Sequence, residues 1–197
     1  QELPELPSLS EEQQSVFDRL LDFCFTPSSK RFLTLGGYAG TGKTTVLSPL
    51  VRTVRQQTSI EVCAYTGKAA SVLRQKGLPA GTIHQLMYVP EKEKSGKVTF
   101  RKRDFLPTSI VAVDEASMVN RDIHEDLLSF PDVKIIYVGD HAQLPHINRD
   151  LKDSFNLMGD PEIRLEQIHR QAESNPIIRI SMQFRNKKTP KPHGKVN

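Results

Sequence analysis

The chain has 197 residues, which is enough for one well-buried domain and too few for two large ones. Hydrophobic residues make up 37% and charged residues 25%, the ordinary mixture of a soluble globular domain. No apolar run approaches the ~18 residues that a membrane-spanning helix needs, and no signal peptide precedes the fold, so we expect neither membrane insertion nor secretion. Cys24 and Cys63 lie in apolar surroundings without CxxC spacing, which favours buried thiols in a reducing compartment.

The positive charge is concentrated near the C-terminal end. The formal net charge is +4. Six of the 27 basic residues and none of the 23 acidic residues lie from Arg179 onward, which leaves 21 basic and 23 acidic residues, a net of −2, before it. We keep two interpretations of this basic end: a solvated linker, or a contact with the phosphate backbone of a nucleic acid.

The hydrophobic pattern predicts strands and helices in alternation. After an extended lead-in over residues 1–9, Ser10 is the expected N-cap of a first helix, with Gln13 in the capping-box position. Strands are then predicted at 31–35, 60–65, 109–114, 134–140 and 162–165, and helices after residue 43 and at 68–77, 121–129 and 175–185. This alternation indicates a mainly parallel sheet with helices on both faces, whose ligands lie at the carboxyl ends of the strands.

Residues 88–107 interrupt the alternation. The segment is highly charged, contains the turn dipeptide Ser95-Gly96 and continues with the β-prone sequence KVTF, so we predict a small inserted β-hairpin. Phe100 and Phe105 in this segment have two interpretations: packing in the hairpin or core, which we favour, and stacking on nucleic-acid bases.

A phosphate-binding loop follows the first predicted strand. Residues 37–44, GYAGTGKT, match G-x-x-x-x-G-K-[ST] without a gap, between a strand and a helix. Glycines let successive backbone amides surround phosphate oxygens, and the helix N-terminus adds its positive end. Lys43 would reach the β and γ phosphates and Thr44 would coordinate Mg²⁺. The candidate nucleotide-binding residues here are Gly37, Ala39, Gly40, Thr41, Gly42, Lys43, Thr44 and Thr45.

A pair of carboxylates follows the strand predicted at 109–114. In IVAVDEAS, Asp114 would hold Mg²⁺ through its water shell, and Glu115 would orient or deprotonate the attacking water. An acidic helix N-cap at a strand end is the structural alternative. The combination with the phosphate-binding loop favours an enzyme that hydrolyses a nucleoside triphosphate.

These and further motifs occur in the order found in the first RecA-like domain of superfamily 1B DNA helicases, the RecD-like and Dda-like group, which the chain resembles from about Leu9 to about Arg185. The matching segments are LSEEQQ (Q motif), GGYAGTGKTT (motif I), AYTGKAA (Ia), TIHQL (Ib), VDEASM (II), GDHAQLP (III) and LEQIHRQ (IV). The loop alone indicates only an NTPase, whereas the ordered set is far more specific. The fold class that it implies is α/β: a RecA-like P-loop NTPase domain with a small inserted β-hairpin.

The resemblance also implies roles for individual residues. Gln13 would contact the adenine edge, Gln143 would sense the γ-phosphate, and Arg170 would stabilise charge there. In this family an insertion at residues 88–107 carries the strand-separating hairpin. The candidate DNA-binding residues are Thr66, Lys68, Thr82, His84 and Phe100.

Most of these residues have a structural alternative. Gln13 could complete the helix cap, Lys68 could be a solvated helix residue, and His84 could be a satisfied histidine beneath the sheet. Gln143 could serve a turn, and Arg170 could be one half of a surface ion pair.

On this resemblance, residues 1–185 form the ATPase domain, with 88–107 inserted, and residues 186–197 form a basic linker toward a second RecA-like domain. That domain, with motifs V and VI, is missing from this chain, so we expect a fragment of a longer enzyme. The implied function is an ATP-dependent DNA helicase or translocase of 5′–3′ polarity. It would use ATP and Mg²⁺, bind single-stranded DNA and meet other replication or repair proteins, in the cytoplasm of a bacterial or phage-infected cell or at the nucleoid.

Two other functions stay open from the sequence. One is a nucleotide-gated DNA-binding or regulatory P-loop subunit that does not translocate. The other is a P-loop ATPase that acts on proteins, for which the matches TGKAA and TIHQL would be coincidence.

Overall fold

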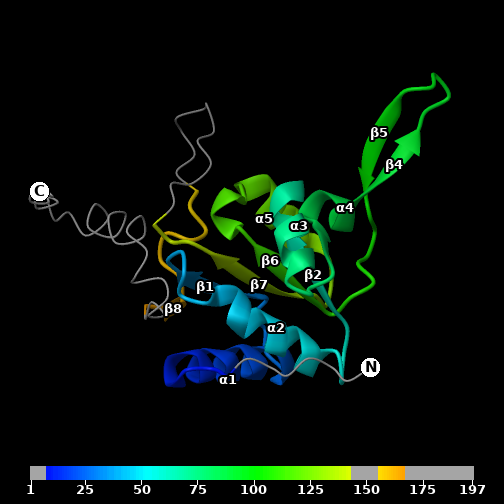
Figure 1. Cartoon of the computed structure of the whole chain (residues 1–197). Helices are drawn as coiled ribbons and strands as arrows, with labels where there is room; N and C mark the ends of the chain where they lie inside the picture. Colours follow the sequence, from blue (N-terminus) through cyan, green and yellow to red (C-terminus); the bar gives the residue numbers. More distant parts are fainter. Residues whose placement is uncertain (1–7, 143–154, 167–197) are drawn as a thin grey trace, which may run out of the picture.

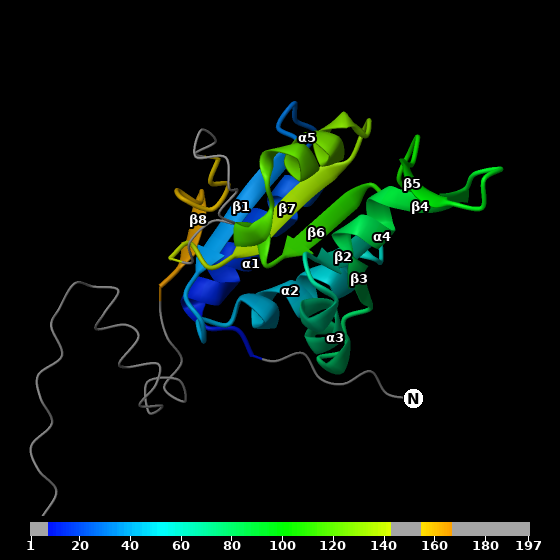
Figure 2. The same ribbon diagram turned by 90° about the horizontal axis from the view of Figure 1, so that it is seen from above.

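A six-stranded parallel β-sheet forms the centre of the molecule (Figure 1). The computed structural model describes residues 8–142 and 155–166. Viewed from above, the strands follow the order β3-β2-β6-β7-β1-β8 (Figure 2). They are β1 (Phe32–Gly37), β2 (Ile60–Ala64), β3 (Ala80–Thr82), β6 (Ile110–Asp114), β7 (Lys134–Gly139) and β8 (Ile163–Leu165). The mainly parallel α/β sheet predicted from the sequence is confirmed.

Helices cover both faces of this sheet. The helices packed on one face are α1 (Glu11–Phe25), α2 (Lys43–Val54) and α3 (Gly67–Gln75). The other face carries α4 (Ile83–Met87), the short 3-10 helix η1 (Ala116–Met118) and α5 (Arg121–Ser129). Figure 1 shows α1 and α2 below the sheet and α5 above it.

Strand β7 shows why the sequences of the central strands are continuous apolar runs. Its Ile136 and Val138 belong to the core beneath α1 and α2, while Ile135 and Tyr137 belong to the core beneath α5. All four side chains are buried. Because successive residues of a strand point to opposite faces, a strand covered on both sides must be apolar at every position.

The N-terminus of α1 has the expected capping box. The amide of Gln13 donates to Ser10 Oγ at 3.2 Å, and the amide of Ser10 donates to Gln13 Oε1 at 3.1 Å. These two bonds satisfy amides that the first turn of a helix otherwise leaves without a partner.

Three short elements, β3, α4 and η1, differ from the sequence-based expectation. The pattern predicted neither β3 nor α4, which follow one another directly along the chain. Thr82 ends β3 and is also the N-cap of α4, where its hydroxyl accepts the amide of Gln85 at 3.2 Å. The helix predicted at 175–185 and the boundary between 1–185 and 186–197 lie outside the described residues.

The predicted hairpin is present and projects away from the sheet (Figure 1). It consists of β4 (Tyr88–Lys92) and β5 (Val98–Lys102), paired antiparallel, with Gly96 at φ 85° in the turn. Phe100 is 73% exposed and Phe105 is 70% exposed. The packing interpretation that we favoured for both rings is therefore wrong, because both side chains remain largely open to solvent.

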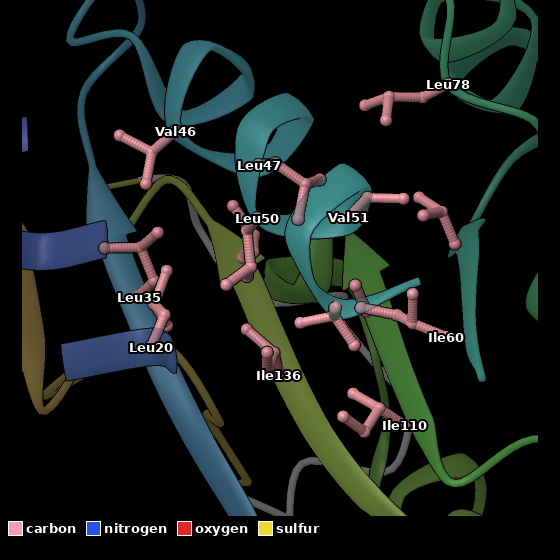
Figure 3. Packing of buried hydrophobic residues seen from close by; sticks show 14 of the residues in the cluster. Leu20, Leu35, Val46, Leu47, Leu50, Val51, Ile60, Leu78, Ile110 and Ile136 are labelled. Carbon is pink, nitrogen blue, oxygen red and sulfur yellow. The ribbon is translucent and has the colours of Figure 1, made fainter. Parts of the chain in front are cut away.

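The main core lies between α2 and the sheet. In Figure 3, Leu47 and Leu50 of α2 point toward the strands, where Ile136 lies. Cys24 and Cys63 are buried free thiols, as predicted, and burial raises the pKa of Cys24 to about 12. Among the helices of residues 8–142 and 155–166, none has the length and apolar character needed to cross a membrane.

Leu50 gives a test of this packing. Its side chain is fully buried, so Leu50→Ala should lower the free energy of unfolding by about 2–5 kcal/mol through lost burial and a residual cavity. Val72→Ala is the control, because Val72 is 41% exposed on α3 and its truncation should cost only about 0.5 kcal/mol. Denaturant titrations of both variants measure the difference, and equal losses would contradict the assigned core.

Candidate functional site

The phosphate-binding loop connects β1 to α2 at the carboxyl edge of the sheet. Gly40 and Gly42 have φ angles of 85° and 83°, in the left-handed region that residues with a Cβ rarely adopt. Gly42 is also the N-cap of α2, so the helix starts directly at Lys43. The loop therefore depends on glycine at these positions and presents the positive end of α2 to a phosphate.

Side chains within the loop close it on itself. The hydroxyl of Thr41 donates to the carbonyl of Tyr38 at 2.9 Å, and Thr41 is 1% exposed. Lys43 Nζ donates to the carbonyls of Gly37 and Tyr38 at 2.6 and 3.0 Å. The lysine charge is thus held over the mouth of the loop, where a triphosphate would lie.

Gln13 joins the Q-motif helix to this loop. Its side chain is 1% exposed, and its Nε2 donates to the carbonyl of Thr41 at 3.4 Å while its Oε1 completes the α1 cap. The capping alternative for Gln13 is therefore present in the structure. The residue nevertheless lies against the phosphate-binding loop, so a contact with an adenine edge stays a proposal.

Asp114 is the last residue of β6, the second strand from β1 in the sheet, and Glu115 follows it. Burial raises the pKa of Asp114, and the bond from the Glu115 amide, together with the charges of Lys43 and Lys76, opposes this rise. Glu115 has φ 55°, and its amide donates to Asp114 Oδ1 at 2.9 Å. This bond fixes the backbone of Glu115 relative to the Asp114 carboxylate at the end of the strand.

Lys76 is a residue of this site that the motifs did not indicate. It is the C-cap of α3, and its Nζ lies 3.5 Å from Thr44 Oγ1. Its charge also acts on Asp114. Lys76 is not part of any of the sequence motifs. It lies near the site only because of where α3 ends in the folded domain.

The donor set fits Mg²⁺. A threonine hydroxyl, and a partly buried carboxylate acting through the water shell, suit this ion when phosphates and waters complete its coordination. Within residues 8–142 and 155–166 there is no cluster of three or more acidic, histidine or cysteine side chains able to hold a metal alone. Thr44 and Asp114 would therefore share the ion with a bound nucleotide, as the sequence-based expectation requires.

Thr66 links this site to the start of α3. It is the N-cap of α3, accepting the amide of Ala69 at 3.2 Å, and its hydroxyl donates to Glu115 Oε2 at 3.1 Å. A residue expected at DNA thus contacts the residue expected to orient water. The sequence motifs place Thr66 and Glu115 in separate roles and did not predict this contact.

The remaining candidate DNA-binding residues lie along α3, α4 and the hairpin. Lys68 and His84 are exposed, which contradicts the alternative of a histidine beneath the sheet, because the His84 ring faces outward beside Tyr65 and Tyr88. Both interpretations of Lys68 remain. A groove of about 600 Å³ runs along His84, Gln85, Tyr88, Pro90, Phe100 and Arg103. Gln143 and Arg170 lie outside the described residues.

The fold and the loop together define a RecA-like P-loop NTPase domain. A Pif1 protein from Bacteroides sp, solved in complex with ADP-AlF4, has the same fold, with a TM-score of 0.59 at 22% identity over 93% of this chain and 47% of that one. The AAA domain family matches residues 8–196. The chain belongs to this family, as a first RecA-like domain of the superfamily 1B DNA helicases.

Curated relatives agree with this assignment. The ATP-dependent RecD2 DNA helicase of Deinococcus radiodurans is 35% identical over 179 residues, which span 88% of this chain and 23% of that protein. The ATP-dependent DNA helicase dda of Enterobacteria phage T4 is 29% identical over 144 residues, which span 69% of this chain and 32% of that protein. This chain thus spans less than a third of the length of either relative.

The Lys76 contact predicts a shift in the pH dependence of magnesium-nucleotide binding. Mg²⁺ needs the Asp114 carboxylate, so binding is lost as the pH falls through the pKa of Asp114. Because the Lys76 charge lowers that pKa, Lys76→Gln should raise it and move the loss to higher pH. Fluorescent ADP, titrated with and without Mg²⁺ across pH, measures this. Lys68→Gln is the control on the same helix, and an unchanged midpoint in Lys76→Gln would contradict the contact.

Proposed function

We propose that this chain is the N-terminal motor domain of an ATP-dependent DNA helicase or translocase that binds ATP–Mg²⁺ and single-stranded DNA and moves 5′ to 3′. The observation that carries the proposal is the convergence of two sets of residues. The charges of Lys43 and Lys76 act on Asp114, and Lys76 lies beside Thr44, which supports one shared phosphate site. Glu115, next to Asp114, is hydrogen-bonded to Thr66, a candidate DNA contact.

The chemistry follows from the positions of these side chains. Lys43 neutralises phosphate oxygens, and backbone amides of the loop orient the triphosphate. Mg²⁺ held by Thr44 and Asp114 would neutralise charge on the phosphates. Glu115 orients the attacking water and accepts its proton. Gln143 and Arg170 are proposed to complete the site around the terminal phosphate.

The proposed DNA path runs over α3, α4 and the hairpin. Thr66 and Thr82 offer hydroxyls at the two helix N-termini, and Lys68 offers an exposed charge. Exposed Phe100 and the ring of His84 offer surfaces on which bases can stack. Contacts to backbone and base faces bind strands with little sequence preference.

A second RecA-like domain is proposed to bind the other side of the nucleotide. Closure of the two domains around ATP and opening after hydrolysis would move the enzyme along the strand. The length of the relatives supports this proposal, since this chain spans only 23% and 32% of them. We expect the 197 residues alone to bind nucleotide modestly, hydrolyse it slowly and unwind nothing. Other replication or repair proteins are proposed as further partners.

Two variants separate nucleotide binding from hydrolysis. Lys43→Ala should abolish binding of fluorescent ADP–Mg²⁺, because the loop loses the charge held over its mouth. Glu115→Gln should retain binding and lower single-turnover ATP hydrolysis by about 10²–10⁴-fold, because the carboxylate that accepts the proton is lost. Undiminished binding in Lys43→Ala, or unchanged hydrolysis in Glu115→Gln, would show that these residues are wrongly assigned.

Salt dependence tests the strand-binding surface. Affinity for an oligothymidylate should fall as salt rises, and Lys68→Ala should reduce the slope of log affinity against log salt by about 0.7, the value for one single-strand phosphate contact. Lys30→Ala is the control, because Lys30 pairs with Glu162 far from α3. Fluorescence anisotropy measures both slopes. If Lys68→Ala and the unmodified chain have the same slope, Lys68 does not contact a strand phosphate.

A further inference from the structure

We propose that His141 is a positioning residue for nucleotide binding, because its ring packs on Tyr38 and holds the phosphate-binding loop in the form that receives a polyphosphate. This role rests on the proposed function, since it takes the loop as the nucleotide site. The observation that carries it is the contact of the two rings, whose centroids lie 4.6 Å apart at an interplanar angle of 49°. The sequence motifs contain both residues and assign a role to neither.

The sheet brings the two rings together. Strands β1 and β7 are parallel neighbours, with Gly36 opposite Gly139. Tyr38 lies two residues beyond Gly36, and His141 lies two residues beyond Gly139. Because both segments leave the same edge of adjacent strands, the strand register sets the ring contact.

The backbone carbonyl of Tyr38 organises the phosphate-binding loop. It accepts hydrogen bonds from the amide and the hydroxyl of Thr41 at 3.3 and 2.9 Å. It also accepts one from Lys43 Nζ at 3.0 Å. The orientation of Tyr38 therefore decides where the lysine charge is held, and the His141 ring is packed against the side chain of this same residue.

His141 itself is closely packed. A Cβ at residue 36 would lie 3.1 Å from His141 Nδ1 and 2.4 Å from Pro161 Cγ, so glycine at this position leaves the room that the ring and the proline fill. Within residues 8–142 and 155–166, no group hydrogen-bonds the buried Nδ1 atom of His141. Packing therefore places the ring against the loop.

The charges around His141 favour its neutral form. Burial lowers the pKa of His141, and the charges of Arg164 and Lys43 lower it further, against the opposite effect of Asp140 and Glu166. The ring is therefore neutral at neutral pH and packs on Tyr38 without adding a charge. The effect of Lys43 also shows that the ring lies within electrostatic reach of the phosphate site.

Loss of this contact should weaken nucleotide binding by population. A loop that adopts its binding form only for a fraction of the time binds with an affinity reduced by that fraction. Aromatic pairs of this kind stabilise a conformation enough to change its population about three- to tenfold. His141→Ala should therefore raise the Kd for fluorescent ADP by about three- to tenfold.

A double-mutant cycle on the full chain tests the contact. The Kd for fluorescent ADP is measured for the unmodified chain, His141→Ala, Tyr38→Ala and the double variant. The double variant should lose no more affinity than either single variant, because each truncation alone removes the ring contact. Phe25→Ala is the control at the far end of α1 from Gln13, and it should bind ADP like the unmodified chain. Losses that multiply in the double variant, or unchanged binding in His141→Ala, would overturn the proposal.

Rescue and magnesium dependence distinguish positioning from general damage. His141→Phe keeps a ring without a charge, so its Kd should lie within about twofold of the unmodified chain. Mg²⁺ is expected at Thr44 and Asp114, whereas the rings act on the loop, so His141→Ala should lower ADP affinity by the same factor with and without Mg²⁺. An equal loss in His141→Phe and His141→Ala, or a loss seen only with Mg²⁺, would contradict positioning by the ring.

The outcomes also separate this role from the proposed function. If Lys43→Ala binds ADP as tightly as the unmodified chain, the nucleotide site itself is wrongly assigned. If Lys43→Ala loses binding while His141→Ala retains it, the nucleotide site stands and the role of His141 is wrong.

Discussion

The parallel pairing of β1, β7, β6 and β2 is the constraint on which the site depends. Strands covered on both faces must be apolar along their length, so polar chemistry can begin only where they end. Parallel direction brings those ends to one edge. Groups from distant parts of the chain meet there, outside the apolar core. They are the Lys43 ammonium, the Thr44 hydroxyl and the carboxylates of Asp114 and Glu115. The sheet register, rather than contacts between the polar residues, sets their spacing.

At the carboxyl edge of the sheet, lysine charges offset the cost of burying the charged form of Asp114. Burial makes the ionised form of Asp114 costly, and two lysines reduce that cost, one from the phosphate-binding loop and one from the far end of α3. Lys76 therefore belongs to the electrostatics of the nucleotide site although it is exposed and carries no motif. Helix α3 consequently meets the nucleotide site at both of its ends, through Thr66 at its start and Lys76 at its finish.

Much of the site could be predicted because its chemistry is local in sequence. The phosphate-binding loop requires glycine where φ is positive, as at Gly40 and Gly42, so its motif is visible in the sequence. The two carboxylates after an apolar strand can likewise be recognised without knowing the tertiary structure. The contact of Thr66 with Glu115 could not be predicted, since it depends on which strands are neighbours. Strand β3 and helix α4 are too short for a periodic signal. The exposure of Phe100 depended on how far the hairpin projects, which residue spacing does not encode.

The root of the hairpin has a mechanical consequence. The carboxylate of Asp126 on α5 accepts hydrogen bonds from the Tyr88 hydroxyl, where the hairpin leaves the domain, and from Lys102 Nζ at 2.8 Å, where it returns. Both legs of the projecting arm are thus tied to a single anchor. A sideways load at its outer end would therefore reach α5 through this one carboxylate, which opposes bending at the base of the hairpin.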